Sequence, residues 1–287
     1  MATATPVRHT PDAADRALLN ELQRGLALTA TPYAEVAARL DMPEDDVLAR
    51  IRVLKDARIV RQISPIFDTR SLGYTSSLVA ARYPEDRLFD GAAVVSGHPG
   101  VSHNYRRTHA FNLWFTVAIA PGARLGLEET LDILSRESGA ESMRLLPTLR
   151  LYKINVQLDM TDGAARDARD AAPPAPKPDT PPPPPTDADR DMIRILQQDL
   201  PIEPRPLAAL GRPAGVSEDA LTEALVDFER RGLMRRFAAV LNHRKAGFGA
   251  NGMAVWRAPE ERLEELGPRM SAFKAVSHCY KRPTYPD

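Results

Sequence analysis

Two short polar stretches hold the side chains best suited to chemistry. Residues 101–107 read Val-Ser-His-Asn-Tyr-Arg-Arg, and residues 276–282 read Val-Ser-His-Cys-Tyr-Lys-Arg. Alternation along a strand predicts that three side chains of each stretch share one sheet face: His103, Tyr105 and Arg107 in the first, and His278, Tyr280 and Arg282 in the second. Asn104 and Arg106 are expected on the opposite face of the first strand.

Such a face offers an imidazole, an aromatic wall and a fixed cation. Imidazole ligates iron or transfers a proton near neutral pH, a guanidinium group binds carboxylates bidentately, and a phenol ring stacks. The combination suits a flat, anionic, metallated ring. A single histidine on a strand is more often only a hydrogen-bonded residue, but repetition of the whole cluster favours a functional site.

The repetition extends beyond these stretches. Ala-Asp-Arg occurs at residues 14–16 and 188–190, and residues 59–74 resemble residues 233–248, both at an offset of 174. Three blocks in one order and nearly one register indicate a duplicated domain. A chain of 287 residues with 43% hydrophobic content is long enough for two ordinary cores, one per repeat.

The expected fold class is α+β, with the same order of elements in each repeat. A winged helix-turn-helix (residues 13–75 and 187–249) precedes a ferredoxin-like βαββαβ domain (residues 76–160 and 250–287), and a proline-rich linker (residues 161–186) joins the repeats. The first-repeat helices are expected at 15–25, 33–40, 43–57, 85–96 and 125–138, and the strands at 59–67, 77–83, 101–107, 111–120 and 142–158.

The second repeat matches only part of this pattern. Helices are expected at 189–199, 205–210, 217–231 and 259–272, and strands at 233–241, 253–257 and 275–282. The equivalent of residues 113–157 is absent, so the second ferredoxin-like domain is predicted to be truncated. An incomplete sheet exposes an unpaired edge, which predicts either poor order near the end of the chain or coverage by another subunit.

Composition and charge exclude several classes of protein. Lys and Arg number 38, as do Asp and Glu, so no global field attracts nucleic acid. The single cysteine, Cys279, excludes an internal disulfide framework and a cysteine-based zinc finger. No apolar run reaches the roughly 18 to 20 residues of a membrane span, and residues 1–12 lack the apolar core of a secretory signal. We therefore expect a cytoplasmic protein that does not associate with a membrane.

The candidate recognition helices argue against DNA as a partner. Glu44, Asp45 and Asp46 open the first, and residues 217–229 of the second contain five acids and no base. Acids in a first helical turn suit the helix dipole, but they repel phosphates.

The two polar stretches resemble those of the siroheme decarboxylases, relatives of the Lrp/AsnC regulators. Residues 103–107, followed by Phe-Asn-Leu-Trp-Phe-Thr at 111–116, resemble one subunit type. Residues 276–287, Val-Ser-His-Cys-Tyr-Lys-Arg-Pro-Thr-Tyr-Pro-Asp, resemble the partner subunit. The resemblance covers both repeats and implies a fused version of a heterodimer whose halves pair with each other. The family pattern continues past the final residue.

The resemblance implies a carbon-carbon lyase, a carboxy-lyase. It would convert siroheme to 12,18-didecarboxysiroheme in haem d1 or alternative haem biosynthesis, turning the C12 and C18 acetates into methyl groups. No added cofactor is implied, because the iron belongs to the substrate. A haem-responsive transcriptional regulator and a noncatalytic tetrapyrrole-binding protein are the alternatives.

The implied site draws on both stretches. His103 or His278 would be the acid or the ligand of the substrate iron, and His109 is an equal rival for ring contact. Tyr105, Tyr280 and Tyr285 would be walls or hydrogen-bond donors. A cation on the scissile carboxylate would stabilise the ground state most, so four cations are expected to hold the spectator carboxylates: Arg106, Arg107, Lys281 and Arg282. The role of each histidine, the order of the decarboxylations, the use of both hairpins on one ring and a homo-oligomer are left open.

Overall fold

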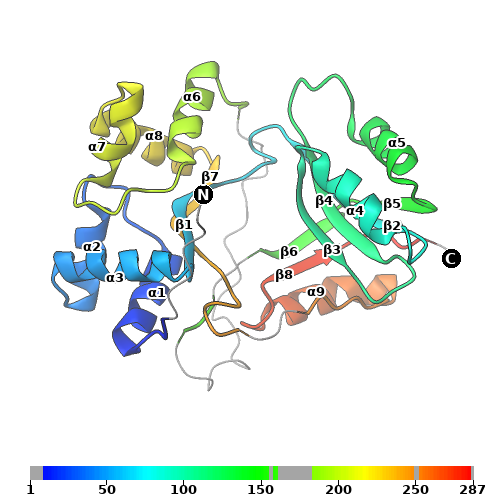
Figure 1. Ribbon diagram of the computed structural model, residues 1–287, viewed down its shortest axis with the longest axis horizontal. Coiled ribbons are helices and arrows are strands. Elements are labelled where there is room, and N and C mark those ends of the chain that lie inside the picture. The colour runs from blue at the N-terminus through cyan, green and yellow to red at the C-terminus, as the bar shows by residue number, and fades with distance from the viewer. Residues whose placement is uncertain (1–8, 155–157, 161–182, 249–251, 286–287) are drawn as a thin grey trace. The chain divides into compact units, whose positions relative to one another are not determined.

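The computed structural model describes residues 9–154, 158–160, 183–248 and 252–285 (Figure 1). The chain divides into two compact units, and each unit takes segments from both repeats. Of the described residues, the first unit comprises 9–68, 158–160, 183–248 and 252–258, and the second comprises 69–154 and 259–285. Most of the predicted proline-rich linker, residues 161–182, lies outside the described residues.

The first unit contains both predicted helix-turn-helix segments. Their elements are α1 (Ala13–Arg24), α2 (Pro32–Leu40), α3 (Glu44–Asp56) and β1 (Val60–Phe67), then α6 (Asp187–Leu196), α7 (Pro206–Gly211), a 3-10 turn (Arg212–Ala214), α8 (Glu218–Arg230) and β7 (Met234–Leu241). Each set of three helices buries one apolar stripe, with Leu18 and Ile51 in the first set and Leu225 in the second fully buried. The predicted order of three helices and a strand is confirmed in both repeats.

The wing strands of the two repeats pair with each other. β1 and β7 form one antiparallel two-stranded sheet, with Ile63 opposite Ala239 and Pro65 opposite Phe237 (Figure 1). Ile63, Phe237 and Ala239 are all buried. Because this sheet joins one strand from each repeat, burial of its apolar face links the two sets of helices into one unit.

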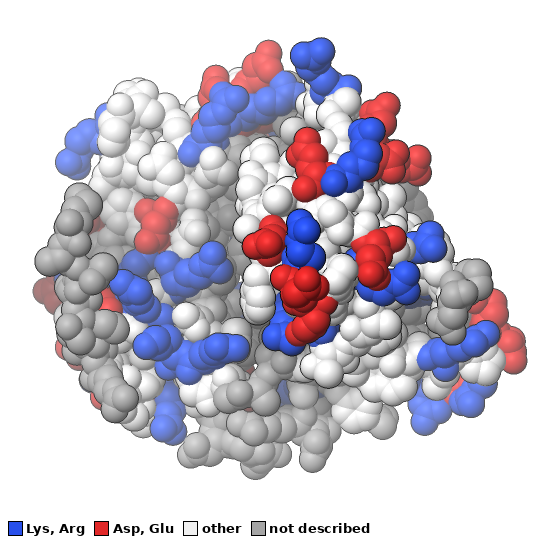
Figure 2. Space-filling view, turned by 45° about the vertical axis from the view of Figure 1, so that its right-hand side comes forward, with Lys and Arg blue, Asp and Glu red and all other residues white. Residues whose placement is uncertain are grey.

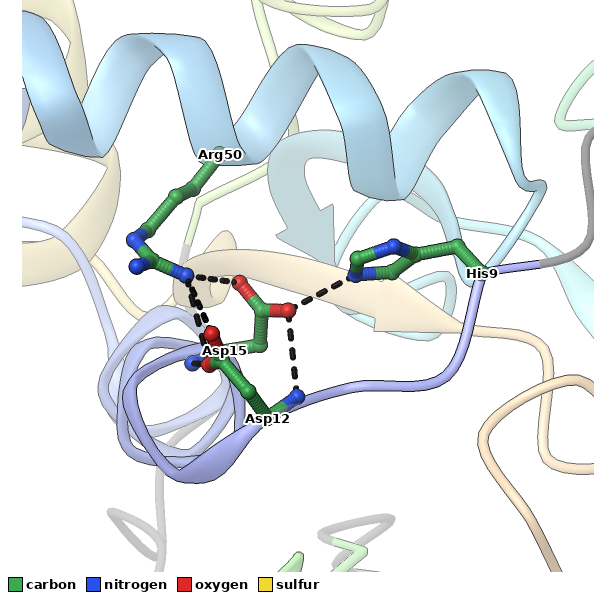
Figure 3. Close-up of polar contacts among 4 residues, drawn as sticks. All are labelled: His9, Asp12, Asp15 and Arg50. Carbon is green, nitrogen blue, oxygen red and sulfur yellow. Dashed lines mark hydrogen bonds and ion pairs between the residues drawn. The ribbon is translucent and has the colours of Figure 1, made fainter.

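A buried carboxylate ties α1 to α3. Asp15 is 1% exposed, and Figure 3 shows His9 and Arg50 approaching its carboxylate from different sides. Arg50 Nη1 donates to Asp15 Oδ1 at 2.8 Å, and His9 Nε2 lies 2.7 Å from Asp15 Oδ2. Asp12 caps the helix by accepting from the Asp15 backbone N–H at 2.7 Å, and the hydrogen bond from this N–H lowers the pKa of Asp12. The network fixes the first turn of α1 on α3.

Replacing Asp15 by Asn is expected to lower the free energy of unfolding by about 2 kcal/mol, because it leaves Arg50 without its buried charged partner. Urea denaturation measures the effect. Asp187→Asn is the control, since the Asp187 side chain is 96% exposed in its pair with Arg190 and such pairs contribute little. Equal stability of the two variants would contradict a structural role for the Asp15 network.

The second unit contains the predicted ferredoxin-like sheet. Its elements are β2 (Thr75–Arg82), α4 (Leu88–Gly97), β3 (Val101–Arg106), β4 (Leu113–Ile119), α5 (Leu127–Ser138) and β5 (Ser142–Leu146). The strand order β3-β4-β2-β5 is the one expected for βαββαβ. Val79, Phe115 and Val117 belong to the core that packs with Leu88 of α4 and Leu131 of α5. Both helices thus cover one face of the sheet, and the alternate side chains form the other face.

A second sheet joins the repeats within this unit. β6 (Arg150–Ile154) of the first repeat pairs antiparallel with β8 (His278–Lys281) of the second, and the second repeat adds a 3-10 turn (Glu260–Arg262) and α9 (Leu263–Ser271). The expected single closing strand over 142–158 is therefore two strands. Pro147 lies between them and cannot donate to a ladder, so β5 completes its own repeat and β6 pairs with the other.

The strand expected at residues 253–257 is not formed. This segment is irregular, and the side chains of Met253, Val255 and Trp256 are 46%, 73% and 67% exposed. Its first-repeat equivalent, β2, lies between β4 and β5. Among the described residues no strand lies beside the segment, and a lone strand leaves its ladder groups unpaired.

Charges of both signs are intermixed on the right-hand part of the face that Figure 2 displays. Figure 2 shows many Lys and Arg side chains next to Asp and Glu on the face it displays, in keeping with the balance of 38 bases and 38 acids. No helix in the described part of the chain is both long and apolar enough to cross a bilayer.

Candidate functional site

The side chains of His103, Tyr105 and Arg107 form one continuous group on β3 and the residue after it. The ring centroids of His103 and Tyr105 are 6.1 Å apart, and Arg107 Cζ lies 4.9 Å from the Tyr105 ring centroid. The predicted placement of the three on one face is confirmed. His103 and Tyr105 are exposed, whereas Arg107 is partly buried.

The second repeat reproduces this group on β8. The rings of His278 and Tyr280 stack with centroids 6.0 Å apart, and Arg282 Cζ lies 4.6 Å from the Tyr280 ring centroid. We call each group a His-Tyr-Arg triad. Two triads with the same internal geometry are what a duplicated ligand-binding surface would retain, and each presents an imidazole, a phenol ring and a guanidinium group in a row.

The neighbouring cations lie on the opposite strand faces and are already paired. Arg106 forms an ion pair with Glu85, and its Cζ lies 5.8 Å from the ring centroid of Phe89 in α4. Lys281 forms the equivalent ion pair with Glu260. The structure therefore does not bring Arg106 and Lys281, both predicted to bind substrate, together with the triads.

The triad arginines lack such partners. Within the described residues, neither Arg107 nor Arg282 forms an ion pair with a carboxylate, and Arg107 Nε is buried there without a hydrogen-bond partner. Arg282 donates from Nη1 to the Leu146 carbonyl, and burial lowers the pKa of its guanidinium, which still remains charged at neutral pH. A poorly hydrated guanidinium group with unused donors is suited to a ligand carboxylate.

His109 occupies a different position. It lies in the hairpin turn, where its Nδ1 accepts from the Phe111 backbone N–H at 3.0 Å and its ring stacks on Phe111 at 6.3 Å. A pocket next to it is lined by Glu85, Arg106, Arg107, Thr108, His109 and Asn112. His109 is thus near Arg107, but the lining of this pocket does not include His103.

The helix-free face of the sheet carries a largely apolar floor beside the first triad. Strand register places Thr116, Leu78 and Leu146 in one row with His103, and Trp114, Ala80 and Arg144 in the next row with Tyr105. Three strand spacings make this floor about 14 Å wide. Arg144 stands at its far edge, so cations border the floor on both sides.

The segment after β8 is held at that far edge. Tyr285 OH donates to the Leu145 carbonyl, and Arg144 Cζ lies 5.8 Å from the Tyr285 ring centroid. Together with the bond from Arg282 to Leu146, these contacts place the end of the second triad along β5. Residues 282–285, in the segment expected to be poorly ordered or covered by another subunit, thus contact β5 of the first repeat, and residues 286–287 lie outside the described residues.

Four residues near the triads were not predicted from the sequence. Arg144 could have been found, because alternation in β5 puts it on the face away from the core. The others are Thr116 and two serines: Ser102 Oγ lies 2.9 Å from His103 Nδ1, and Ser277 Oγ lies 3.0 Å from His278 Nδ1. The serines are part of the repeated stretch, which was the available signal.

Neither the acids nor the cysteine suggest a resident metal. In the described part of the chain, no group of three or more His, Cys, Asp or Glu could hold a metal ion. Burial raises the pKa of the Cys279 thiol, as expected for a small packed residue. A single exposed imidazole can still act as an axial ligand to iron that a macrocycle already holds.

Comparisons with known proteins identify both kinds of domain. A family model for the siroheme decarboxylase NirDL-like HTH domain matches residues 15–61 and 189–235, and one for the AsnC-like ligand binding domain matches residues 71–153 and 245–287. Each model thus occurs twice, as the repeat requires.

Several relatives are named as siroheme decarboxylases or their subunits. The siroheme decarboxylase of Hydrogenobacter thermophilus is 38% identical over 267 residues, which are 93% of this chain and 78% of that protein. The siroheme decarboxylase alpha subunit of Desulfovibrio desulfuricans is 40% identical over 52% of this chain and 84% of its own length. A crystal structure of the siroheme decarboxylase NirDL in co-complex with an iron-uroporphyrin III analogue matches 95% of this chain and 77% of that chain, with 32% identity and a TM-score of 0.71. The chain therefore belongs to the siroheme decarboxylase family.

Proposed function

We propose that the chain decarboxylates siroheme at the C12 and C18 acetates to give 12,18-didecarboxysiroheme, in haem d1 or alternative haem biosynthesis. The observation that carries the proposal is the pair of His-Tyr-Arg triads, whose arginines have no carboxylate partner among the described residues. It is supported by the family and by the NirDL structure named as a complex with an iron-uroporphyrin III analogue.

In this proposal the protein binds and orients the ring and supplies a proton. Arg107 and Arg282 hold spectator carboxylates, and Tyr105 and Tyr280 line the ring. The bond to each scissile carboxylate breaks and carbon dioxide leaves. The electron pair, delocalised into the substrate macrocycle, takes a proton from His103 or His278 to complete a methyl group. Each step is redox-neutral, so no added cofactor is required.

The pairing of strands across the repeats supports a fused-heterodimer arrangement. β6 of the first repeat pairs with β8 of the second, and relatives named as alpha subunits match about half of this chain. A cytoplasmic location, a homo-oligomer and the contact of both hairpins with one ring stay predictions.

Contacts inside the first unit support the expectation that DNA is not a partner. Arg50 bonds Asp15 of α1, Arg52 Nη2 donates to the Ile202 carbonyl at 2.6 Å, and Lys55 forms an ion pair with Asp199. These bases of α3 are therefore engaged with the protein itself. We infer that the two helix-turn-helix segments join the two repeats through the β1–β7 sheet, rather than bind DNA.

Anaerobic incubation with siroheme tests the proposal. We expect a product lighter than siroheme by two molecules of carbon dioxide in mass spectrometry. Unchanged siroheme would defeat the decarboxylase proposal. If the absorption spectrum of the pigment then still changed on titration with the protein, the noncatalytic tetrapyrrole-binding alternative would hold instead.

A further inference from the structure

Ser102 contacts the histidine beside it because the strand is irregular there. Adjacent side chains of a regular strand point to opposite faces, yet Ser102 Oγ lies 2.9 Å from His103 Nδ1. The register of β3 on β4 shifts between Val101 and His103, a β-bulge that leaves Ser102 without a partner residue and re-aims its side chain. Ser102 Oγ also lies 3.1 Å from Oγ1 of Thr116, the residue opposite His103.

The second repeat makes the same contact from a different backbone. Ser277 immediately precedes β8, which begins at His278, and its Oγ lies 3.0 Å from His278 Nδ1. A bulge produces the contact in one repeat, whereas the start of a strand produces it in the other. Because two unlike local geometries give the same pair of atoms, the contact is not a by-product of either geometry.

A hydrogen bond at Nδ1 determines what the other ring nitrogen can do. A neutral imidazole has one donor and one acceptor nitrogen, and the partner of one selects the state of the other. A serine hydroxyl that donates to Nδ1 leaves a proton on Nε2 for transfer. A hydroxyl that accepts from Nδ1–H leaves the Nε2 lone pair for iron. Serine serves both roles, and it also fixes the ring plane.

We propose that Ser102 and Ser277 are positioning residues that hold His103 and His278 through Nδ1, so that Nε2 is the atom presented to the substrate. The catalytic part of this inference rests on the proposed function. The positioning part concerns the ligand-free protein and can be tested without turnover.

The test compares Ser102→Ala and Ser277→Ala with Ser102→Thr and Ser277→Thr in the full chain. Ring-nitrogen NMR signals of ligand-free protein are expected to show one fixed tautomer of each histidine in the wild type and an exchanging mixture in the Ala variants. With siroheme, kcat is expected to fall roughly tenfold in each Ala variant, as for the loss of one orienting hydrogen bond of about 1.4 kcal/mol, with little change in KM. The Thr variants, which keep the hydroxyl, are expected to restore both readouts.

Ser96→Ala is the matched control. Ser96 Oγ accepts a hydrogen bond from Asn104 Nδ2 at 3.0 Å. Asn104 follows His103 in the chain but lies on the other strand face, so this variant removes a nearby serine hydroxyl that does not contact a histidine. Unchanged ring-nitrogen signals, or unchanged kcat, in the Ser102 and Ser277 Ala variants would overturn the inference. If the wild type itself leaves siroheme unchanged, the proposed function fails, while the NMR comparison still decides whether the serines position the rings.

Discussion

Replacing His278 by Ala is expected to lower kcat for siroheme by roughly 100-fold or more, or to shift the absorption bands of the bound ring. The fall in kcat follows if the imidazole supplies the proton, because a positioned general acid accelerates a reaction about 10²- to 10⁴-fold. The band shift follows if the imidazole ligates the substrate iron. Anaerobic turnover and visible spectra of the same samples separate the two roles, and His103→Ala measured alongside shows which histidine has which role.

Two further histidines control this experiment. His109→Ala tests the rival in the hairpin turn, whose ring stacks on Phe111 rather than on a triad tyrosine. His243→Ala removes a histidine of the first unit and should leave both readouts unchanged. Wild-type turnover together with a wild-type spectrum in His278→Ala would remove His278 from the site.

Local patterns predicted the elements of the fold well. The helices α1 and α8 begin and end within two residues of the expected positions, because their apolar residues recur at helical spacing and a side-chain cap stands at each start. What the sequence could not give is which strands become neighbours. The burial along β1 and β6 does not alternate, and nothing local in either strand shows that it pairs with the other repeat.

The segment at 253–257 also shows that local patterns do not determine strand pairing, because here an expected strand is not formed. Its apolar residues favour a strand locally, yet a strand is stable only when its backbone groups find a partner. Ser102 illustrates a second limit, because strict alternation would have turned it away from His103 and only the bulge brings it back. Both failures concern non-local pairing rather than propensity.

Strand alternation did separate the cations of the site. It placed Arg106 and Arg107 on opposite faces of the strand. The structure adds the reason why only Arg107 is left for a ligand: Glu85 neutralises Arg106. The repeat itself carried this information, since Glu85 and Glu260 each precede their basic partner by 21 residues. An acid and a base repeated together indicate a structural ion pair, whereas a base repeated without an acid is left for a ligand.

Replacing Arg107 or Arg282 by Gln is expected to weaken siroheme binding roughly 10- to 100-fold for each substitution. A charge-assisted bond to a carboxylate contributes about 1.5–3 kcal/mol, and Arg282 is desolvated enough for its pKa to be lowered by burial. Spectator carboxylates keep their charge through the reaction, so the loss should raise the dissociation constant and KM more than it lowers kcat. Anaerobic absorption titration and initial rates measure the two effects.

Arg106→Gln and Lys281→Gln are the matched controls, because each removes one positive charge next to a triad arginine. Their partners, Glu85 and Glu260, lie on the opposite strand faces, so these variants should bind siroheme within a few-fold of the wild type. If only the loss of a positive charge mattered, the control variants and the triad-arginine variants would weaken binding equally. That weakening would become smaller as salt is added. Equal weakening by Arg106→Gln and Arg107→Gln would show that net charge, and not the face on which the guanidinium lies, determines how the ring carboxylates are held.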